Sequence, residues 1–361
     1  MWLKNTWYIA AFEHEFDQPL VARRLLDVPI IMYRTSDGSY AALEDVCPHR
    51  LLPLSCGKRV DDEIQCGYHG MRFSSEGKCT EVPGQQQIPA AACVTTYPIT
   101  AMYGLIWIWL GSRELADPSL IPDLHWHDDP GWTCSRGYHH VQADFRLMND
   151  NLLDLSHETY VHNKTIGNGE EETIASYPLT VTTEADSVVR AHREMSNIEA
   201  PPFFAMILGH QGAIDRWQTA INFVSGLNIT VATVCPVGVG RDQASISYVM
   251  HLLTPETENS THYFWANVRN YRLEDTELTE TIRQAVLATF DEDKTVLEEQ
   301  QRQIETRNAV VPRVAIRLDE APLRARRLLD GHVKAEAANS EHVVRPVPLV
   351  RDMHEASAQG R

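Results

Sequence analysis

Cys47-Pro48-His49-Arg50 and Cys66-Gly67-Tyr68-His69-Gly70 are the two short stretches on which the interpretation of this 361-residue chain depends. Each stretch offers one cysteine and one histidine, in the order Cys-x-His and then Cys-x-x-His, and sixteen residues separate His49 from Cys66. Thiolates and imidazoles are metal ligands, so the pattern predicts that two loops hold one metal centre between them.

Two kinds of metal centre fit these four ligands. A Rieske [2Fe–2S] cluster takes two thiolates on one iron and two imidazoles on the other. A structural zinc ion also accepts two cysteines and two histidines, but zinc modules usually keep the two residue types on separate segments. Each loop here mixes the two types, so each can serve both irons. We therefore expect Cys47, His49, Cys66 and His69 to bind a Rieske cluster, with zinc as the alternative.

The bulk composition excludes several classes of protein. The chain is 43% hydrophobic and 22% charged, which is ordinary for a soluble globular protein of roughly two domains. A net charge of −17 argues against a nucleic-acid-binding surface. No apolar run is long enough to cross a membrane, the start lacks the features of a signal peptide, and the remaining cysteines show no paired spacing. We expect a cytoplasmic protein.

Residues 1–115 carry the pattern of a small all-β domain. Residues 28–33 and 40–43 are strand-like and flank a turn, and residues 71–73 precede a second turn signal. Residues 105–109 read Leu-Ile-Trp-Ile-Trp, which predicts a buried strand. No long helix is indicated in this part of the chain.

Residues 116–335 carry the pattern of a second domain, of the α+β class. A helical pattern at about 144–160 precedes several strands, and a long helix at about 276–307 follows them, an order that favours an antiparallel sheet packed against helices. Residues 336–361 are polar, and we expect a poorly ordered tail. The strand-like runs are residues 179–182, 220–224, 229–234, 246–250 and 262–265.

A second metal site is indicated by His157 and His162. The two are five residues apart, which on a regular helix separates them by about 140° around the axis. If both bind one metal, the helix must end or distort between them. A carboxylate would complete a facial triad of two histidines and one carboxylate, the usual site for non-haem Fe(II) that must leave positions open for O₂.

Asp293 is the candidate for that carboxylate. It lies on the apolar stripe of the long helix, whereas Asp291 and Glu292 point about 160° and about 100° away from it. A carboxylate on a buried face costs several kcal/mol unless it is paired or bound to a metal. The alternative is a buried salt bridge to an arginine such as Arg146 or Arg216.

Asp154 precedes His157 by three residues, so on a helix the two lie on one side. Imidazoles that bind metals usually donate their other N–H to a carboxylate. Asp154 is therefore a candidate to orient His157 or to connect it to a histidine of the cluster. A solvated charge near a helix N-terminus is the alternative.

Taken together, these motifs resemble those of the Rieske non-haem iron aromatic oxygenases. Within that family the chain is most similar to the oxygenase components of vanillate O-demethylase, and dicamba O-demethylases and toluenesulfonate methyl-monooxygenases are also similar. The resemblance covers nearly the whole chain. Besides the metal-binding motifs, it is carried by Asn5-x-Trp7-Tyr8, Asn151-Leu-Leu-Asp154-Leu-x-His157, Ala200-Pro201-Pro202-Phe203 and Asp215-Arg216-Trp217-Gln218.

The resemblance implies a fold, cofactors and partners. It implies a Rieske domain followed by a helix-grip catalytic domain, assembled as a homotrimer, with Fe(II) held by His157, His162 and Asp293. It places Asn151 and Asp154 among the catalytic residues, Asp154 carrying electrons from the cluster of one subunit to the iron of its neighbour. It also implies a separate NAD(P)H-dependent reductase with flavin and its own [2Fe–2S] centre.

The reaction expected from the resemblance is the O-demethylation of a small methoxy-substituted aromatic acid by O₂, which gives the phenol and formaldehyde. Asn228 and His251 are similar in placement to positions that face substrate in the dicamba-type relatives, and a structural place on a strand is the alternative for both. Within the same fold, hydroxylation of an aromatic methyl or ring carbon is the other reading. A plain electron carrier would leave two-thirds of the chain unexplained, and two structural zinc sites would give a protein without the red-brown colour of a Rieske centre.

Overall fold

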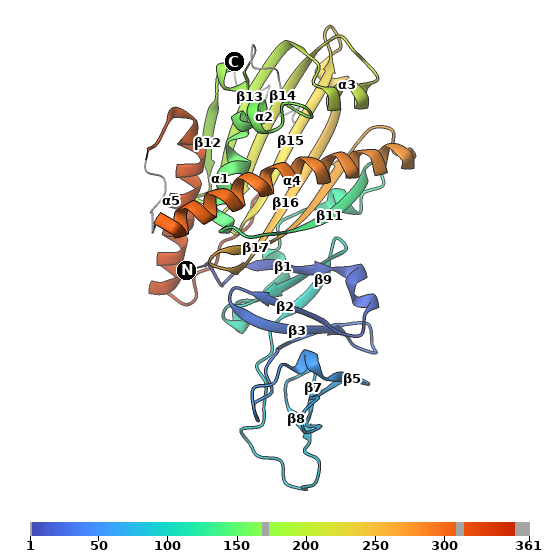
Figure 1. Cartoon of the computed structure of the whole chain (residues 1–361), viewed down its shortest axis with the longest axis vertical. Helices are drawn as coiled ribbons and strands as arrows, with labels where there is room; N and C mark the ends of the chain where they lie inside the picture. Colours follow the sequence, from blue (N-terminus) through green and yellow to red (C-terminus); the bar gives the residue numbers. More distant parts are fainter. Residues whose placement is uncertain (1, 168–172, 308–313, 351–361) are drawn as a thin grey trace. The chain divides into compact units, whose positions relative to one another are not determined.

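The computed structural model of this chain describes residues 2–167, 173–307 and 314–350 (Figure 1). The chain divides into two compact units. The first comprises Met1–Ile121 with Thr254–Glu258 and Glu336–Val343, and the second comprises Pro122–Leu253, Asn259–Ala335 and Val344–Arg361. The first continuous segment of the first unit ends at Ile121, and two later segments of the chain return to this unit.

The first unit is built from three small antiparallel sheets. Their strand orders are β1-β10-β9, β2-β3-β4 and β5-β6-β7-β8. The strands are β1 (Trp7–Phe12), β2 (Val21–Leu25), β3 (Val28–Arg34), β4 (Tyr40–Glu44), β5 (Lys58–Val60), β6 (Glu63–Gln65), β7 (Arg72–Ser74), β8 (Cys79–Glu81), β9 (Ile99–Met102) and β10 (Leu105–Trp109).

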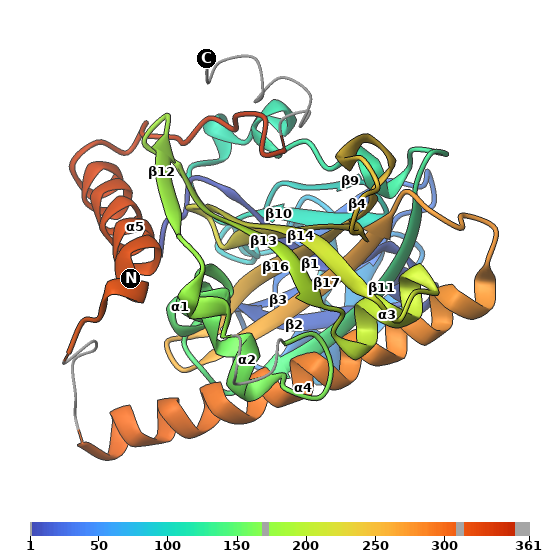
Figure 2. The ribbon, with the colours of Figure 1, turned by 90° about the horizontal axis from the view of Figure 1, so that it is seen from above.

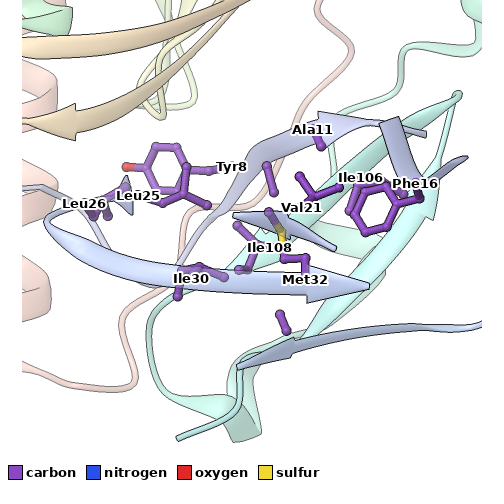
Figure 3. Packing of buried hydrophobic residues seen from close by; sticks show 12 residues of the cluster. Tyr8, Ala11, Phe16, Val21, Leu25, Leu26, Ile30, Met32, Ile106 and Ile108 are labelled. Atoms are coloured by element: carbon purple, nitrogen blue, oxygen red, sulfur yellow. The ribbon is translucent and has the colours of Figure 1, made fainter. Parts of the chain in front are cut away.

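Apolar side chains from two of these sheets meet in one core (Figure 3). Ile106 and Ile108 of β10 are fully buried and pack with Ile30 and Met32 of β3 and with Phe16. All five residues of β10 are buried, as the continuous apolar run predicted. The predicted hairpin of β3 and β4 is also confirmed, with Ile30 paired to Glu44 at one end of the register.

The second unit contains an antiparallel sheet of seven strands in the order β11-β17-β16-β15-β14-β13-β12. Five of these strands include or overlap the predicted runs. The sequence pattern did not indicate β11 or β13, because turn signals and polar residues interrupt their apolar alternation. The strands are β11 (Thr133–Val141), β12 (Thr180–Glu184), β13 (Val188–Glu199), β14 (Ala213–Phe223), β15 (Leu227–Pro236), β16 (Ser245–Thr257) and β17 (Ser260–Arg269).

Helices pack against this sheet. The long helix α4 (Thr276–Arg307) has the predicted bounds and runs across the strands, and α1 (Phe145–Leu153), α2 (Glu158–Val161) and α3 (Pro202–Leu208) lie on the same side (Figures 1 and 2). The buried residues of α4 include Leu278, Ile282, Val286, Phe290 and Leu297, which form the predicted apolar stripe. A further helix, α5 (Glu320–Ala338), had not been predicted.

The C-terminal segment differs from the expected tail. Within the first unit, the carboxylate of Glu336 accepts hydrogen bonds from the backbone N–H groups of Lys4 and Asn5 at 3.0 and 2.5 Å. Asn5 in turn donates to the carbonyl of Ser340 at 2.9 Å. The described part of this segment is therefore ordered by its contacts with the N-terminus; residues 351–361 lie outside the described part.

In the described parts of the chain, no helix combines the length and the apolar character that a membrane crossing requires.

The core shown in Figure 3 makes a testable contribution to stability. Ile108→Ala should lower the free energy of unfolding by about 2–5 kcal/mol, because it removes a fully buried side chain and leaves a cavity. Ile88→Ala, at a position 36% exposed, should change it by less than about 0.5 kcal/mol. Denaturant titration followed by tryptophan fluorescence measures both, and equal losses would contradict the assigned core.

Candidate functional site

The two Cys-His loops of the first unit have the same backbone conformation. In each loop the cysteine N–H donates to the carbonyl five residues later, Leu52 and Met71, at 2.9 and 2.8 Å. In each loop the cysteine carbonyl also accepts from the residue four positions later, which has a positive φ. That residue is Leu51 (φ 57°) in one loop and Gly70 (φ 76°) in the other. The repeated conformation gives both loops the same way of presenting a cysteine and a histidine.

The four predicted ligands separate by burial. Cys47 and Cys66 are 2% and 3% exposed, whereas His49 and His69 are exposed, with ring centroids 4.5 Å apart. Backbone N–H groups in the first loop also point at the sulfur of Cys47. Sulfur atoms on the inner side and imidazoles on the outer side are the arrangement that a two-iron cluster with unlike ligands on its irons requires. The residues present therefore fit a Rieske cluster.

Gly67 allows the second loop to pack closely on its neighbour. A Cβ at this position would lie 2.5 Å from the carbonyl oxygen of Cys56. A side chain is therefore excluded at this position, because the backbone of Cys56 would have to shift to make room for it.

In the second unit, His157, His162 and Asp293 come together. Their ligand atoms lie within 4.8 Å of one another. The Nε2 atoms of His157 and His162 lie 3.3 and 3.2 Å from the same oxygen, Oδ1 of Asp293. Donor atoms at right angles on a metal ion, with bonds of about 2.1 Å, are about 3 Å apart. The geometry therefore fits a single ion bound by two histidines and one carboxylate.

The chain between the helices brings the two histidines to one side. The predicted helix over 144–160 is interrupted at Asp154, whose φ of −109° and ψ of 80° are not helical. A 3₁₀ turn at Leu155–His157 follows, and the four-residue helix α2 ends at His162. The distortion that the five-residue spacing required is therefore present, as a break and two short turns.

Each histidine donates a hydrogen bond from its other ring nitrogen, Nδ1, to an oxygen atom. Nδ1 of His157 lies 2.6 Å from the backbone carbonyl oxygen of Asp154, and Nδ1 of His162 lies 2.7 Å from the carboxylate of Glu292. The carboxylate of Asp154 instead accepts from the N–H and the hydroxyl of Ser156, at 3.1 and 2.6 Å. Asp154 thus orients His157 through its main chain, and the side chain expected to do so bonds elsewhere.

Asn151 contacts the third predicted ligand. Its Nδ2 donates to Oδ1 of Asp293 at 3.0 Å. Burial opposes ionisation of Asp293, but hydrogen bonds and the charges of His157 and His162 outweigh it and lower the pKa of this carboxyl. Burial likewise opposes protonation of His157, but its contacts with Asp293 raise the pKa of His157 to about 9. A metal cation bound here would take the place of these protons.

The structure does not show the alternative, a salt bridge between Asp293 and one of the two arginines considered. Arg146 pairs with Asp144, and Arg216 pairs with Glu158 at 2.7 Å. Neither arginine contacts Asp293 in the described part of the chain.

A cavity opens beside the three candidate ligands, and all three line it. Polar side chains form one part of its wall, among them Thr230, Ser247, His251 and Asn267. The remainder is mainly apolar. Leu155, Phe203, Phe204, Val234, Val249 and Phe290 are among the apolar residues. A largely apolar cavity with a few polar groups suits a small aromatic molecule.

Of the two residues expected to face substrate, His251 lines the cavity. Its Nδ1 lies 2.6 Å from the hydroxyl of Tyr263, and its Nε2 lies 3.2 Å from Oγ1 of Thr230. Burial lowers the pKa of His251 to about 3, so the imidazole is neutral. Both ring nitrogens are occupied, and Thr230 stands at the cavity wall beside it.

Asn228 does not face this cavity. Its amide nitrogen donates to Asn149 at 2.7 Å, and its amide oxygen accepts from Asn222 at 2.9 Å. The three amides satisfy one another between β14, β15 and α1. The expectation that Asn228 contacts substrate is therefore wrong. In the described structure Asn228 belongs to a buried amide cluster, because its side chain bonds to Asn149 of α1 and to Asn222.

Two contacts near the site were missed by the sequence reasoning. Glu292 was expected to point away, but its side chain is long enough to reach His162 from a position about 100° around the helix. Glu158, next to His157, accepts from Arg216 and Gln218 at 2.7 and 2.5 Å. For the second contact, the sequence offered one signal: Arg216 and Gln218 are two residues apart, so on a strand their polar side chains share one face.

Comparison with known proteins agrees with this geometry. Residues 6–98 match the Rieske [2Fe-2S] domain family, and residues 141–335 match the vanillate O-demethylase oxygenase C-terminal domain family. The vanillate O-demethylase oxygenase subunit of Pseudomonas sp. (strain HR199 / DSM 7063) is 39% identical over 349 residues, which cover 93% of this chain and 96% of that protein.

Solved structures show the same fold. The crystal structure of dicamba monooxygenase bound to 3,6-dichlorosalicylic acid has a TM-score of 0.86 and 33% identity, covering 93% of this chain and 99% of that chain. Another crystal structure of dicamba monooxygenase, with non-heme iron and dicamba, has a TM-score of 0.77 at 33% identity and covers 93% and 98%. With a Rieske domain, a matching catalytic domain and full-length relatives, this chain belongs to the Rieske aromatic oxygenase family, as an oxygenase component of the vanillate O-demethylase type.

Proposed function

We propose that this chain is the terminal oxygenase of a monooxygenase system that removes the methyl group from a methoxy-substituted aromatic acid. The observation that carries the proposal is that His157, His162 and Asp293 line the same largely apolar cavity. The similarity to vanillate O-demethylase and to dicamba monooxygenase supports the O-demethylating reaction.

His157, His162 and Asp293 would hold iron as a facial triad. Bound iron supplies the activation of O₂, because this set of ligands leaves coordination positions open. The protein's part is to hold the ligands in place. Asn151 fixes one oxygen of Asp293, and the carbonyl of Asp154 fixes the ring of His157.

The cavity would hold the aromatic ring and exclude bulk water. Phe204, Val249 and Phe290 offer an apolar surface to the ring, which positions the methyl group of the substrate. The carboxylate of the substrate would meet the polar wall, where the hydroxyl of Thr230 stands in front of the neutral His251. The net reaction consumes the methoxy compound, O₂, two electrons and two protons, and gives the phenol, formaldehyde and water.

The electrons would come from a partner protein. The chain has no GxGxxG segment for a dinucleotide, which favours a separate NAD(P)H-dependent reductase with flavin and a [2Fe–2S] centre. We propose that this reductase reduces the Rieske cluster at Cys47, His49, Cys66 and His69. In a homotrimer, Asp154 would then connect the cluster of one subunit to His157 of its neighbour.

Product analysis tests the proposed reaction. The purified protein, a family reductase and NADH are incubated with a panel of methoxybenzoates and hydroxy-methoxybenzoates. We expect formaldehyde and the corresponding phenol in equal amounts for at least one substrate. A panel that includes methylbenzoates tests the other reading: a hydroxymethyl or ring-hydroxylated product without formaldehyde would contradict O-demethylation.

Alanine substitutions can distinguish the three candidate iron ligands from the neighbouring acidic residue Asp291. His157→Ala, His162→Ala and Asp293→Ala should each lower bound iron while the absorbance of the cluster stays normal. Asp291→Ala should keep the iron, because Asp291 is 68% exposed and lies 3.4 Å from His139 rather than at the site. Iron content per cluster, measured by metal analysis, gives the result, and an essential Asp291 would refute the assignment.

Asp154→Asn tests the proposed electron route. Asparagine keeps the backbone carbonyl that orients His157 and an oxygen that can accept from Ser156. Folding and both metals should therefore remain, while the negative charge is lost. Single-turnover reoxidation of the reduced cluster by O₂ with substrate should slow by about 100-fold. Wild-type reoxidation rates with iron fully bound would exclude the relay role of Asp154.

A further inference from the structure

The contact between His162 and Glu292 joins a buried group to a partly exposed one. The imidazole of His162 is 2% exposed, and the carboxylate of Glu292 is 38% exposed. Because an ionised carboxylate can only accept, Nδ1–H of His162 is the donor in the 2.7 Å hydrogen bond. Nε2, which lies 3.2 Å from Oδ1 of Asp293, then faces the centre of the candidate site, where its lone pair is available to a metal ion once the nitrogen carries no proton.

The two candidate histidine ligands donate hydrogen bonds to different kinds of acceptor. His157 donates to a neutral backbone carbonyl, that of Asp154, at 2.6 Å. His162 donates to a full negative charge, that of Glu292. A carboxylate acceptor fixes the tautomer as a carbonyl does, but it also makes the imidazole a stronger electron donor to a metal.

Three consecutive carboxylates of α4 contact histidines in different ways. Asp291 contacts His139, Glu292 contacts His162, and Asp293 lies between His157 and His162. Of the three carboxylates, only that of Asp293 is grouped with ligand atoms of both His157 and His162, so only Asp293 can bind the same metal ion directly. Glu292 therefore adds a second negative charge next to the site without occupying a coordination position.

We propose that Glu292 is a positioning residue for the iron site. It holds His162 in the tautomer that presents Nε2, and its charge, together with that of Asp293, balances the two positive charges of a ferrous ion. This proposal rests on the proposed function only for the identity of the metal. It predicts that the site has no net charge in the ferrous state and that His162 is its stronger imidazole donor.

Two variants separate the two parts of this role. Glu292→Ala removes both the acceptor and the charge, so Fe(II) should bind about 10- to 100-fold more weakly. Glu292→Gln keeps an oxygen that can accept from His162, so the affinity should fall less, but the ferric/ferrous potential of the site should become more positive because a negative charge is lost. Asp291→Asn is the matched control, since it removes a charge one residue away that does not contact His162.

The measurements use the full-length protein with its cluster in place. Equilibrium dialysis against Fe(II) gives the affinity, and a redox titration followed by electron paramagnetic resonance of ferric iron gives the potential. The cluster spectrum reports on folding in every variant. Wild-type affinity in Glu292→Ala, or an unchanged potential in Glu292→Gln, would overturn the proposal. Neither measurement needs substrate, so the absence of O-demethylation would leave both results valid. An Asp293→Ala protein that still binds iron would instead refute the assignment of the iron site.

Discussion

The carboxylate of Asp293 between two imidazoles is the interaction on which the catalytic unit depends. Asp293 is 8% exposed, and a buried charge without partners would destabilise the long helix that carries it. His157, His162 and Asn151 supply three partners. The helix α4 brings Asp293, the helix α1 brings Asn151, and the segment from Leu155 to the end of α2 brings the two histidines. These three parts of the chain must therefore be placed together.

The sheet supports that arrangement by burying other polar groups at the same place. Glu158 follows His157 directly and is held by Arg216 and Gln218 of β14, all of them nearly inaccessible to water. Each member of this group has a partner of opposite charge or a hydrogen bond, which offsets the cost of burial. Through Glu158, the strand holds the turn that presents His157, and the cavity lies over the same strand.

The cluster loops solve a different problem with local geometry alone. Both use the same two backbone hydrogen bonds and the same positive φ, so each cysteine turns inward and each histidine outward. This explains how two loops of unlike sequence can present ligands to one centre. Their ligands lie close in the sequence, and the spacing within each loop is enough to indicate them. Of the candidate iron ligands, by contrast, Asp293 lies 131 positions after His162 in the chain.

The sequence by itself determined the ligand motifs, the long helix with its bounds, the buried strand at 105–109 and the α+β class, because local periodicity and short spacings carry those features. It also located Asp293 on the helix stripe. Only the tertiary structure decided that Glu292 reaches His162, that Asp154 orients His157 through its carbonyl, and that Asn228 lies in an amide cluster while His251 lines the cavity. These outcomes depend on side-chain length and on contacts between distant segments, which no periodicity along the chain records.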